Sequence, residues 1–171
     1  SEKEVNDLIE WALTEFKELN ILVTNAGGPP TKPLLSLNTV DWDKAVAGIL
    51  KPVIICFNKI IPHMAGLGGG RIITLTSITV KSPLVNFALS NTLRAGIAGL
   101  VKTAANEHAR DNVLINNVCP GYTGTERVED IVNDTATREN IPRETALQRI
   151  TSGIPLKRLA TVDEIADTCL L

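Results

Sequence analysis

Polar or turn-forming residues follow three apolar runs of the chain, at the point where each run ends. Ser77 closes RIITLTS, Asn25-Ala26-Gly27 follows ILVT, and Pro120-Gly121 follows VLINNVC. A serine hydroxyl can hydrogen-bond a ligand oxygen, and glycine and proline end a strand and start a loop. In open α/β sheets, ligands bind at the carboxyl ends of the parallel strands. These run ends are therefore the candidate site, provided that the runs form parallel strands.

Helical segments separate the apolar runs. The predicted strands are Ile21–Thr24, Arg71–Thr76 and Val113–Val118. The predicted helices cover about residues 4–19, 39–64 and 86–110. Because strand–helix–strand units place their strands in parallel, we expect an α/β fold with a partial, Rossmann-like doubly wound parallel sheet of three strands flanked by helices. Pro52 and Pro62 lie inside the second helix, and we expect a bend or a break near each.

The chain changes character after Gly121. Residues 122–155 are polar and lack sustained apolar runs, so we expect short helices in a mobile lid. Thr161 and Glu164 then match a capping box, which predicts the start of a last helix. Residues 1–171 are expected to form a single partial Rossmann-like domain, with the lid over residues 122–155.

Composition excludes several classes of partner. The 171 residues are 44% hydrophobic and 21% charged with a net charge of −2, which suits a globular domain and disfavours a nucleic-acid or anionic membrane surface. Three cysteines lie far apart in apolar runs, as buried free thiols do in a reducing compartment. With two histidines and no cysteine–histidine clustering, no metal site is expected. No apolar run approaches the roughly 20 residues of a membrane span, and no secretory leader is visible, so we expect a cytoplasmic protein.

Several motifs, in the correct order along the chain, resemble the short-chain dehydrogenase/reductase family. They are Thr24-Asn25-Ala26-Gly27, Trp42-Asp43 with Leu50-Lys51, Ile73–Ser77, Asn117-Val-Cys-Pro-Gly121, and Ile154-Pro-Leu-Lys-Arg-Leu159 with Asp163-Glu164-Ile165-Ala166. The chain looks most similar to 3-oxoacyl-carrier-protein reductases. The resemblance implies an NAD(P)-dependent oxidoreductase that acts on a small carbonyl or alcohol substrate. It also implies a homodimer or homotetramer joined through long helices, and a lid that covers the substrate.

The family's catalytic pattern is only partly kept. In the family a serine and a tyrosine bind the substrate oxygen, the tyrosine transfers the proton, a lysine holds the nicotinamide ribose, and an asparagine completes a water relay. Matched position by position, these residues are Ser77, Ser90, Arg94 and Ile49. We therefore take Ser77, Ser90 and Arg94 as the candidate catalytic residues.

The three replacements change the expected chemistry. A serine hydroxyl is a far weaker acid than a phenol, so Ser90 could hydrogen-bond a carbonyl but would be a poor general acid. Arg94 can hold a ribose in a fixed fork, yet it relays no proton. Ile49 cannot hydrogen-bond at all. Tyr122, the only tyrosine, is a speculative substitute acid from the lid.

The resemblance also implies a set of cofactor contacts. The candidate residues for binding NAD or NADP are Asn25, Ala26, Gly27, Arg94, Pro120, Gly121, Thr123 and Thr125. Thr123 and Thr125 would hydrogen-bond the carboxamide or a phosphate. The Gly-rich turn with which family members begin is missing here. We favour an incomplete sequence of a longer protein, and the alternative is a minimal chain that has largely lost cofactor binding.

Two functions from different classes remain open. The first is a divergent NAD(P)-dependent oxidoreductase that transfers a hydride between the nicotinamide and a carbonyl or hydroxyl substrate. The second is a non-catalytic relative that acts as a binding or assembly module, as the lost tyrosine, lysine and asparagine suggest. A serine hydrolase is a remote third, because Ser77 lacks a G-x-S-x-G turn and His108 is predicted on the far part of a helix.

Overall fold

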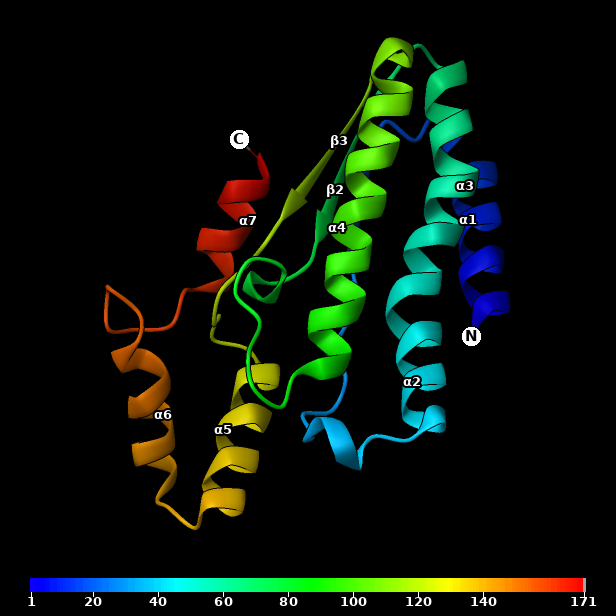
Figure 1. Cartoon of the computed structure of the whole chain (residues 1–171). Helices are drawn as coiled ribbons and strands as arrows, with labels where there is room; N and C mark the ends of the chain where they lie inside the picture. Colours follow the sequence, from blue (N-terminus) through cyan, green and yellow to red (C-terminus); the bar gives the residue numbers. More distant parts are fainter. Residues whose placement is uncertain (171) are drawn as a thin grey trace. The chain divides into compact units, whose positions relative to one another are not determined.

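A computed structural model describes residues 1–170 of the chain. They fall into two compact units, residues 1–119 and residues 120–170 (Figure 1). The expectation of one partial domain with a lid over residues 122–155 stays a prediction.

A three-stranded parallel sheet lies at the centre of the first unit. Its strands are β1 (Ile21–Asn25), β2 (Gly70–Leu75) and β3 (Val113–Val118), in the order β1-β2-β3. The register pairs Thr24 with Thr74, and Thr74 with Asn117. This confirms the predicted α/β fold with three parallel strands, and the predicted strand bounds differ from the observed ones by a single residue at most.

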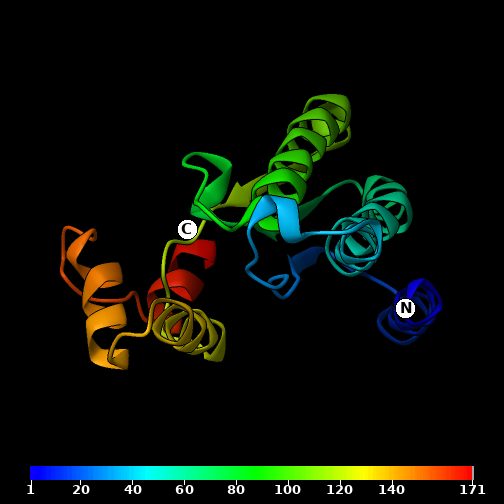
Figure 2. The same ribbon diagram turned by 60° about the horizontal axis from the view of Figure 1, so that its bottom comes forward.

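Three helices lie on one side of this sheet. They are α1 (Glu2–Phe16), α3 (Lys51–Gly66) and α4 (Ala88–His108); α3 and α4 contact the strands, and α1 packs beside α3 (Figures 1 and 2). The core between sheet and helices contains Ile72, Val113, Phe57, Met64 and Ile97. Side chains that alternate with the inward ones point to the opposite face, and Ile21, Val23 and Leu114 are exposed there.

The segment before β2 is one continuous helical run. It comprises α2 (Thr39–Ala45), a π-helical turn η2 (Val46–Leu50) and α3. Asn38 caps its start, because its side-chain oxygen accepts a hydrogen bond from the Asp41 amide at 3.0 Å and the Asp41 carboxylate accepts one from the Asn38 amide at 3.1 Å. The run therefore begins where the predicted helix begins.

The helical run is unbroken at both prolines of the predicted helix, and whether it bends near each of them stays a prediction. Pro52 follows the π turn in the first turn of α3, where a missing backbone N–H is tolerated. Pro62 lies inside α3, and the helix continues past it to Gly66. The π turn before Pro52 thus accommodates the proline, and the helical run continues without a break.

The same run, Thr39–Gly66, is long and apolar enough to cross a membrane by length and composition. Our expectation that no segment reaches this length was wrong. The mean hydropathy of the run reaches 1.6 although Lys51 and Lys59 lie within it. In this fold Val53, Phe57 and Ile60 of the run pack into the core. A core helix passes the same test, so one candidate span is weak evidence for a membrane protein.

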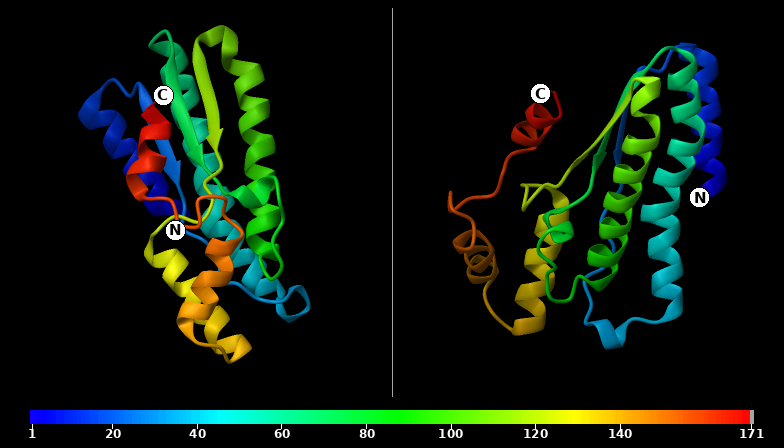
Figure 3. Two further views of the ribbon diagram at one scale, coloured as in Figure 1. Left: turned by 90° about the vertical axis from the view of Figure 1, so that its left-hand side faces the viewer. Right: turned by 45° about the horizontal axis from the view of Figure 1, so that its top comes forward.

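The second unit is helical and has its own small core. It contains α5 (Glu126–Glu139), α6 (Arg143–Ser152) and α7 (Val162–Leu170), which appear in two further views in Figure 3. Val128, Val132 and Ala146 form the buried centre, with Tyr122 packed against it. The short helices α5 and α6 lie where the sequence predicted short helices.

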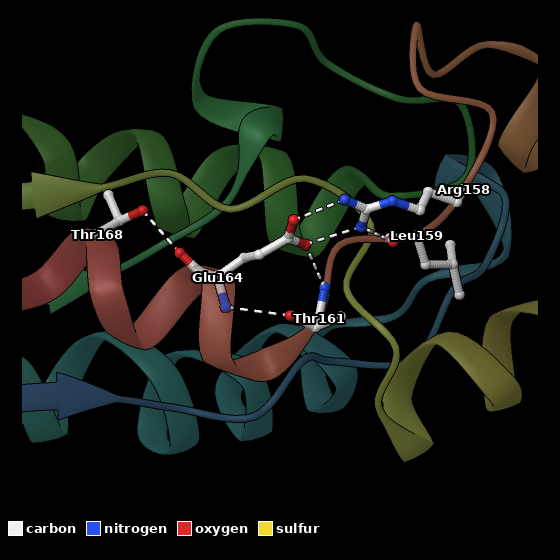
Figure 4. A network of polar contacts seen from close by, with 5 residues as sticks. All are labelled: Arg158, Leu159, Thr161, Glu164 and Thr168. Atoms are coloured by element: carbon white, nitrogen blue, oxygen red, sulfur yellow. Dashed lines mark hydrogen bonds and ion pairs between the residues drawn. The ribbon is translucent and has the colours of Figure 1, made fainter.

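A polar network starts α7, as the capping box predicted (Figure 4). The Glu164 carboxylate accepts a hydrogen bond from the Thr161 amide at 2.8 Å, and the Glu164 amide donates to the Thr161 hydroxyl at 3.1 Å. The guanidinium of Arg158 binds both oxygens of the same carboxylate, at 2.7 and 2.9 Å. The Thr161 and Glu164 amides and the Glu164 carboxylate are thereby hydrogen-bonded at the start of the helix.

Candidate functional site

The carboxyl ends of β1 and β2 lie side by side in the first unit. The two strands pair in parallel through Asn25 and Leu75, so the turn Asn25–Gly27 and the residues Thr76 and Ser77 leave the sheet at the same edge. The structure thus brings together two groups of predicted site residues that are about 50 positions apart in sequence.

Ser77 begins a short helical turn at this edge. Its hydroxyl oxygen accepts a hydrogen bond from the Thr79 amide at 3.2 Å and caps η3 (Ile78–Val80). The side chain is partly exposed. A hydroxyl that accepts one hydrogen bond still has its proton to donate. Ser77 is therefore fixed in place and able to donate to a ligand oxygen.

Arg94 reaches the same edge from α4 and is only 7% exposed. Its Nη1 donates to the carbonyl oxygen of Thr76 at 2.8 Å and to that of Leu75 at 3.4 Å. Its Nη2 donates to the carbonyl oxygens of Ala26 at 3.1 Å and Gly27 at 3.4 Å. The guanidinium therefore connects the backbone at the end of β2 with the backbone of the turn after β1. That Arg94 also contacts a cofactor stays a prediction.

The other two family positions are buried. Ser90 lies one turn before Arg94 on α4 and is 7% exposed. Ile49 lies in the π turn, is 3% exposed and belongs to the hydrophobic core. An aliphatic side chain there offers no hydrogen bond, so the chain's own residues provide no polar group at this position.

A hollow of about 310 Å³ adjoins the turn after β1. Its lining residues are Gly27, Gly28, Pro29, Pro30, Asp41, Lys44, Ala45, Gly48 and Ile49. Hydrogen bonding to the Asn38 backbone, and then to Lys32 at 3.2 Å, lowers the pKa of Asp41. The volume is at the low end of the range for small-molecule sites. Sequence reasoning missed Asp41 and Lys44, whose only signal was their place in the helix that follows the Gly-Gly-Pro-Pro turn.

Buried polar side chains gather around the strand ends. In residues 1–170 they are Thr24, Thr74, Thr76, Thr79, Ser90 and Arg94. The hydroxyls of Thr24, Thr74 and Thr79 have no hydrogen-bond partner in this part of the chain. Thr24 ends one apolar run and Thr74 interrupts another, and the structure pairs the two residues in register.

The remaining predicted residues belong to the second unit. The Thr123 hydroxyl donates to the Gly121 carbonyl at 3.3 Å, and the Thr125 hydroxyl donates to the Thr123 carbonyl at 3.3 Å. Pro120 precedes this segment and is partly buried. These side chains therefore order their own turn. Whether they also contact a cofactor stays a prediction.

The surroundings of Tyr122 do not make its phenol a better acid. It packs against the apolar centre of the second unit, and burial raises the pKa of its phenol. A proton donor that replaces the family's tyrosine would need a lowered pKa instead. As for metals, residues 1–170 contain no group of three or more His, Cys, Asp or Glu side chains placed to hold one.

A family model and two similar proteins all match the chain to dehydrogenases or reductases. A family model described as short chain dehydrogenase matches residues 1–136. The chain is 32% identical over 170 residues to D-beta-hydroxybutyrate dehydrogenase of Rhizobium meliloti, covering 98% of this chain and 65% of that protein. It is 32% identical over 165 residues to 3-oxoacyl-[acyl-carrier-protein] reductase FabG of Staphylococcus epidermidis, covering 96% and 63%.

A solved structure agrees with the sequence relatives. The structure described as ElxO with NADP bound superposes with a TM-score of 0.85 at 27% identity, covering 99% of this chain and 65% of that one. The chain thus spans less than two thirds of the length of these relatives.

Proposed function

Because the chain belongs to the short-chain dehydrogenase family, we propose that the protein is an NAD(P)-dependent oxidoreductase. It transfers a hydride between the nicotinamide and a small carbonyl or hydroxyl substrate. The observation that carries this proposal is the placement of Ser77 and the turn Asn25–Gly27 at adjacent carboxyl ends of β1 and β2. Relatives named as a hydroxybutyrate dehydrogenase and an oxoacyl reductase support the reaction class.

The residues of the turn fit a nucleotide cofactor. Asn25 and Gly27 are exposed, and the space that a side chain at Gly27 would fill is open. Backbone polar groups can therefore come close to a bound molecule. A structure of the relative ElxO contains NADP. When bound, NAD or NADP supplies or accepts the hydride. Asn25, Ala26 and Gly27 would hold this cofactor at the strand ends.

Ser77 orients the substrate, and proton transfer to or from the substrate oxygen is the slow step of the proposed reaction. The Ser77 hydroxyl donates its proton to a hydrogen bond with the substrate oxygen while the Thr79 amide fixes its position. Ser90 is the hydroxyl at the family's acid position, but it is buried and is a weaker acid than a phenol. We therefore expect slow turnover compared with relatives that have a tyrosine there.

Binding of NADH and NADPH to the full-length protein tests this proposal. The fluorescence of the reduced nicotinamide should rise and shift on binding, and the signal should be displaced by the oxidised cofactor. A Ser77→Ala variant should bind the cofactor as the unchanged protein does. If neither NADH nor NADPH binds, the proposed function is wrong.

One set of observations favours a second candidate function. Ile49 is apolar and buried, and both terminal nitrogens of Arg94 already donate to backbone carbonyls. A non-catalytic relative that acts as a binding or assembly module would need the fold of the family but not its proton-transferring side chains. Turnover on a panel of ketones and alcohols that disappears in Ser77→Ala would exclude this candidate.

Assembly through the long helices is part of the proposal. Ala95, Gly96 and Gly99 are exposed on α4, and the space beside both glycines is open, so another helix can approach closely. We expect a homodimer or homotetramer by light scattering. A Gly96→Leu variant should shift this assembly toward the monomer, and an unchanged mass would count against the interface.

The compartment and the remaining partners are also proposals. We propose a cytoplasmic protein that binds neither nucleic acid nor membranes. The net charge of −2 and the free state of Cys56, Cys119 and Cys169 support this. Fractionation of cells that produce the full-length protein, with the soluble and membrane fractions probed separately, tests it.

A further inference from the structure

The guanidinium of Arg94 connects two chain segments that the sheet itself leaves unconnected. β1 and β2 pair as far as Asn25 and Leu75, and the pairing between these two segments ends there. Arg94 then binds the carbonyl oxygens of Leu75 and Thr76 on one side and those of Ala26 and Gly27 on the other. We propose that Arg94 is a positioning residue that fixes the turn after β1 relative to Ser77 before any ligand binds.

The chemistry of the contact favours this role. Hydrogen bonds from a charged donor are stronger than neutral ones, and their strength rises in a buried site of low dielectric constant. Arg94 is 7% exposed, and its shortest contact, to the Thr76 carbonyl, is 2.8 Å. The planar guanidinium directs Nη1 and Nη2 apart, so a single side chain can serve both segments.

The two fixed segments are those that the proposed reaction would use. Thr76 directly precedes Ser77, and Gly27 both ends the turn and lines the hollow. The distance between the substrate-orienting hydroxyl and the turn therefore depends on a side chain from a third element, α4. This consequence rests on the proposed function, whereas the link between the two segments is independent of it.

We expect that a lysine at position 94 cannot perform the positioning role of the arginine. It carries a single nitrogen on a flexible chain and cannot direct two separate groups of donors to two segments. Arg94→Lys keeps the charge and removes the fork, and Arg94→Met removes both. Lys102→Met is the matched control, because Lys102 is an exposed cation on the same helix.

Amide hydrogen exchange on the cofactor-free, full-length protein tests the proposal. In both Arg94 variants the amides of residues 25–28 and 76–80 should exchange at least about tenfold faster, since each segment loses charge-assisted hydrogen bonds. The core amides of Ile72 and Ile115 should change less. Lys102→Met should leave both segments unchanged.

Three results would overturn the proposal. The first is unchanged exchange in both segments. The second is an equal increase at every amide, including Ile72 and Ile115, which would indicate a general loss of stability. The third is normal protection in Arg94→Lys together with retained NADH binding, which would show that the charge acts on the cofactor directly.

A measurement on the unchanged protein covers the case in which the variants do not fold. If Arg94 is held by four carbonyls, the Nη1 and Nη2 protons should give separate, slowly exchanging NMR signals without any cofactor. Averaged signals would contradict the proposal. None of these readouts needs NAD(P), so failure of the proposed function, seen as absent cofactor binding, is distinguished from failure of this inference.

Discussion

Two serine hydroxyls close to the strand ends have different surroundings. Ser77 is partly exposed and capped by the Thr79 amide, whereas Ser90 is 7% exposed on α4. The resemblance to the family implied both as candidates, but the sequence could not distinguish an accessible hydroxyl from a buried one. Accessibility makes Ser77 the better candidate for contact with a substrate.

We expect Ser77→Ala to lower kcat by about 10²–10³-fold, as loss of one hydrogen-bond donor to a reacting oxygen does. Cofactor binding should stay the same, because in the proposed mechanism the hydroxyl contacts the substrate and not the cofactor. Steady-state kinetics and a nicotinamide fluorescence titration measure the two effects. Ser82→Ala, at an exposed serine just beyond η3, is the control. Equal activity of both variants would contradict the role of Ser77.

The unpartnered hydroxyl of Thr74 gives a prediction about stability. Thr74 is 1% exposed, and its Oγ1 has no hydrogen-bond partner within residues 1–170. Thr74→Val keeps the shape and removes an unsatisfied buried group, so the free energy of unfolding should rise by about 1 kcal/mol. Denaturant titration measures it.

Thr76→Val is the matched control for this prediction. Its hydroxyl donates to the Asn117 side-chain oxygen at 2.8 Å, so its loss should destabilise the fold by about 1 kcal/mol. Destabilisation by Thr74→Val as well would show that a buried water bonds that hydroxyl.

At the scale of elements, helix starts were predicted better than the helix interior. Asn38 and Thr161 begin α2 and α7 through local side-chain hydrogen bonds, and such bonds depend on residues three positions apart. The π turn Val46–Leu50 was not predicted, because its geometry depends on how the helix fits its neighbours around Ile49 and Pro52.

The start of α7 should respond to pH. Hydrogen bonds from Arg158, and then from the Thr161 backbone, lower the pKa of Glu164 from 4.5 to about 2. A lowered pKa in the folded state means that the carboxylate contributes stability above pH 4.5. This contribution is lost as the pH falls toward about 2. The first turn of α7 should therefore become less ordered over this interval.

An NMR titration of the Glu164 carboxyl carbon measures this pKa directly. In Glu164→Gln, the amide signals of residues 161–165 should lose the part of their pH dependence that follows the titration of Glu164 in the unchanged protein. A midpoint close to 4.5 for Glu164 would contradict the network drawn in Figure 4.

At the scale of the whole molecule, each compact unit has its own core. Met64 and Ile72 are fully buried in the first unit, and Val132 and Ala146 are fully buried in the second. The first core takes in Ile72 and Ile115, which belong to the apolar runs that the sequence predicted as strands. The smaller core was not predicted, because its members lie scattered among polar residues.

Met64→Ala should lower the free energy of unfolding of the first unit by about 2–5 kcal/mol, because a cavity remains where a fully buried side chain was removed. Leu35→Ala, at a residue that is 98% exposed, should change it by less than about 0.5 kcal/mol. Denaturant unfolding followed by tryptophan fluorescence compares them. Similar values for the two variants would contradict the assigned core.

The three parallel strands, the helices between them and the candidate site at the strand ends could all be predicted from the amino-acid sequence. These features follow from hydrophobic periodicity and local capping, which short stretches of sequence contain. What Arg94 binds, which hydroxyls are buried and which serine is accessible became known from the folded structure. Arg94 contacts carbonyls that precede it by 18 to 68 positions, and no local pattern encodes such contacts. They form when α4 packs on the sheet and brings the guanidinium to the ends of β1 and β2.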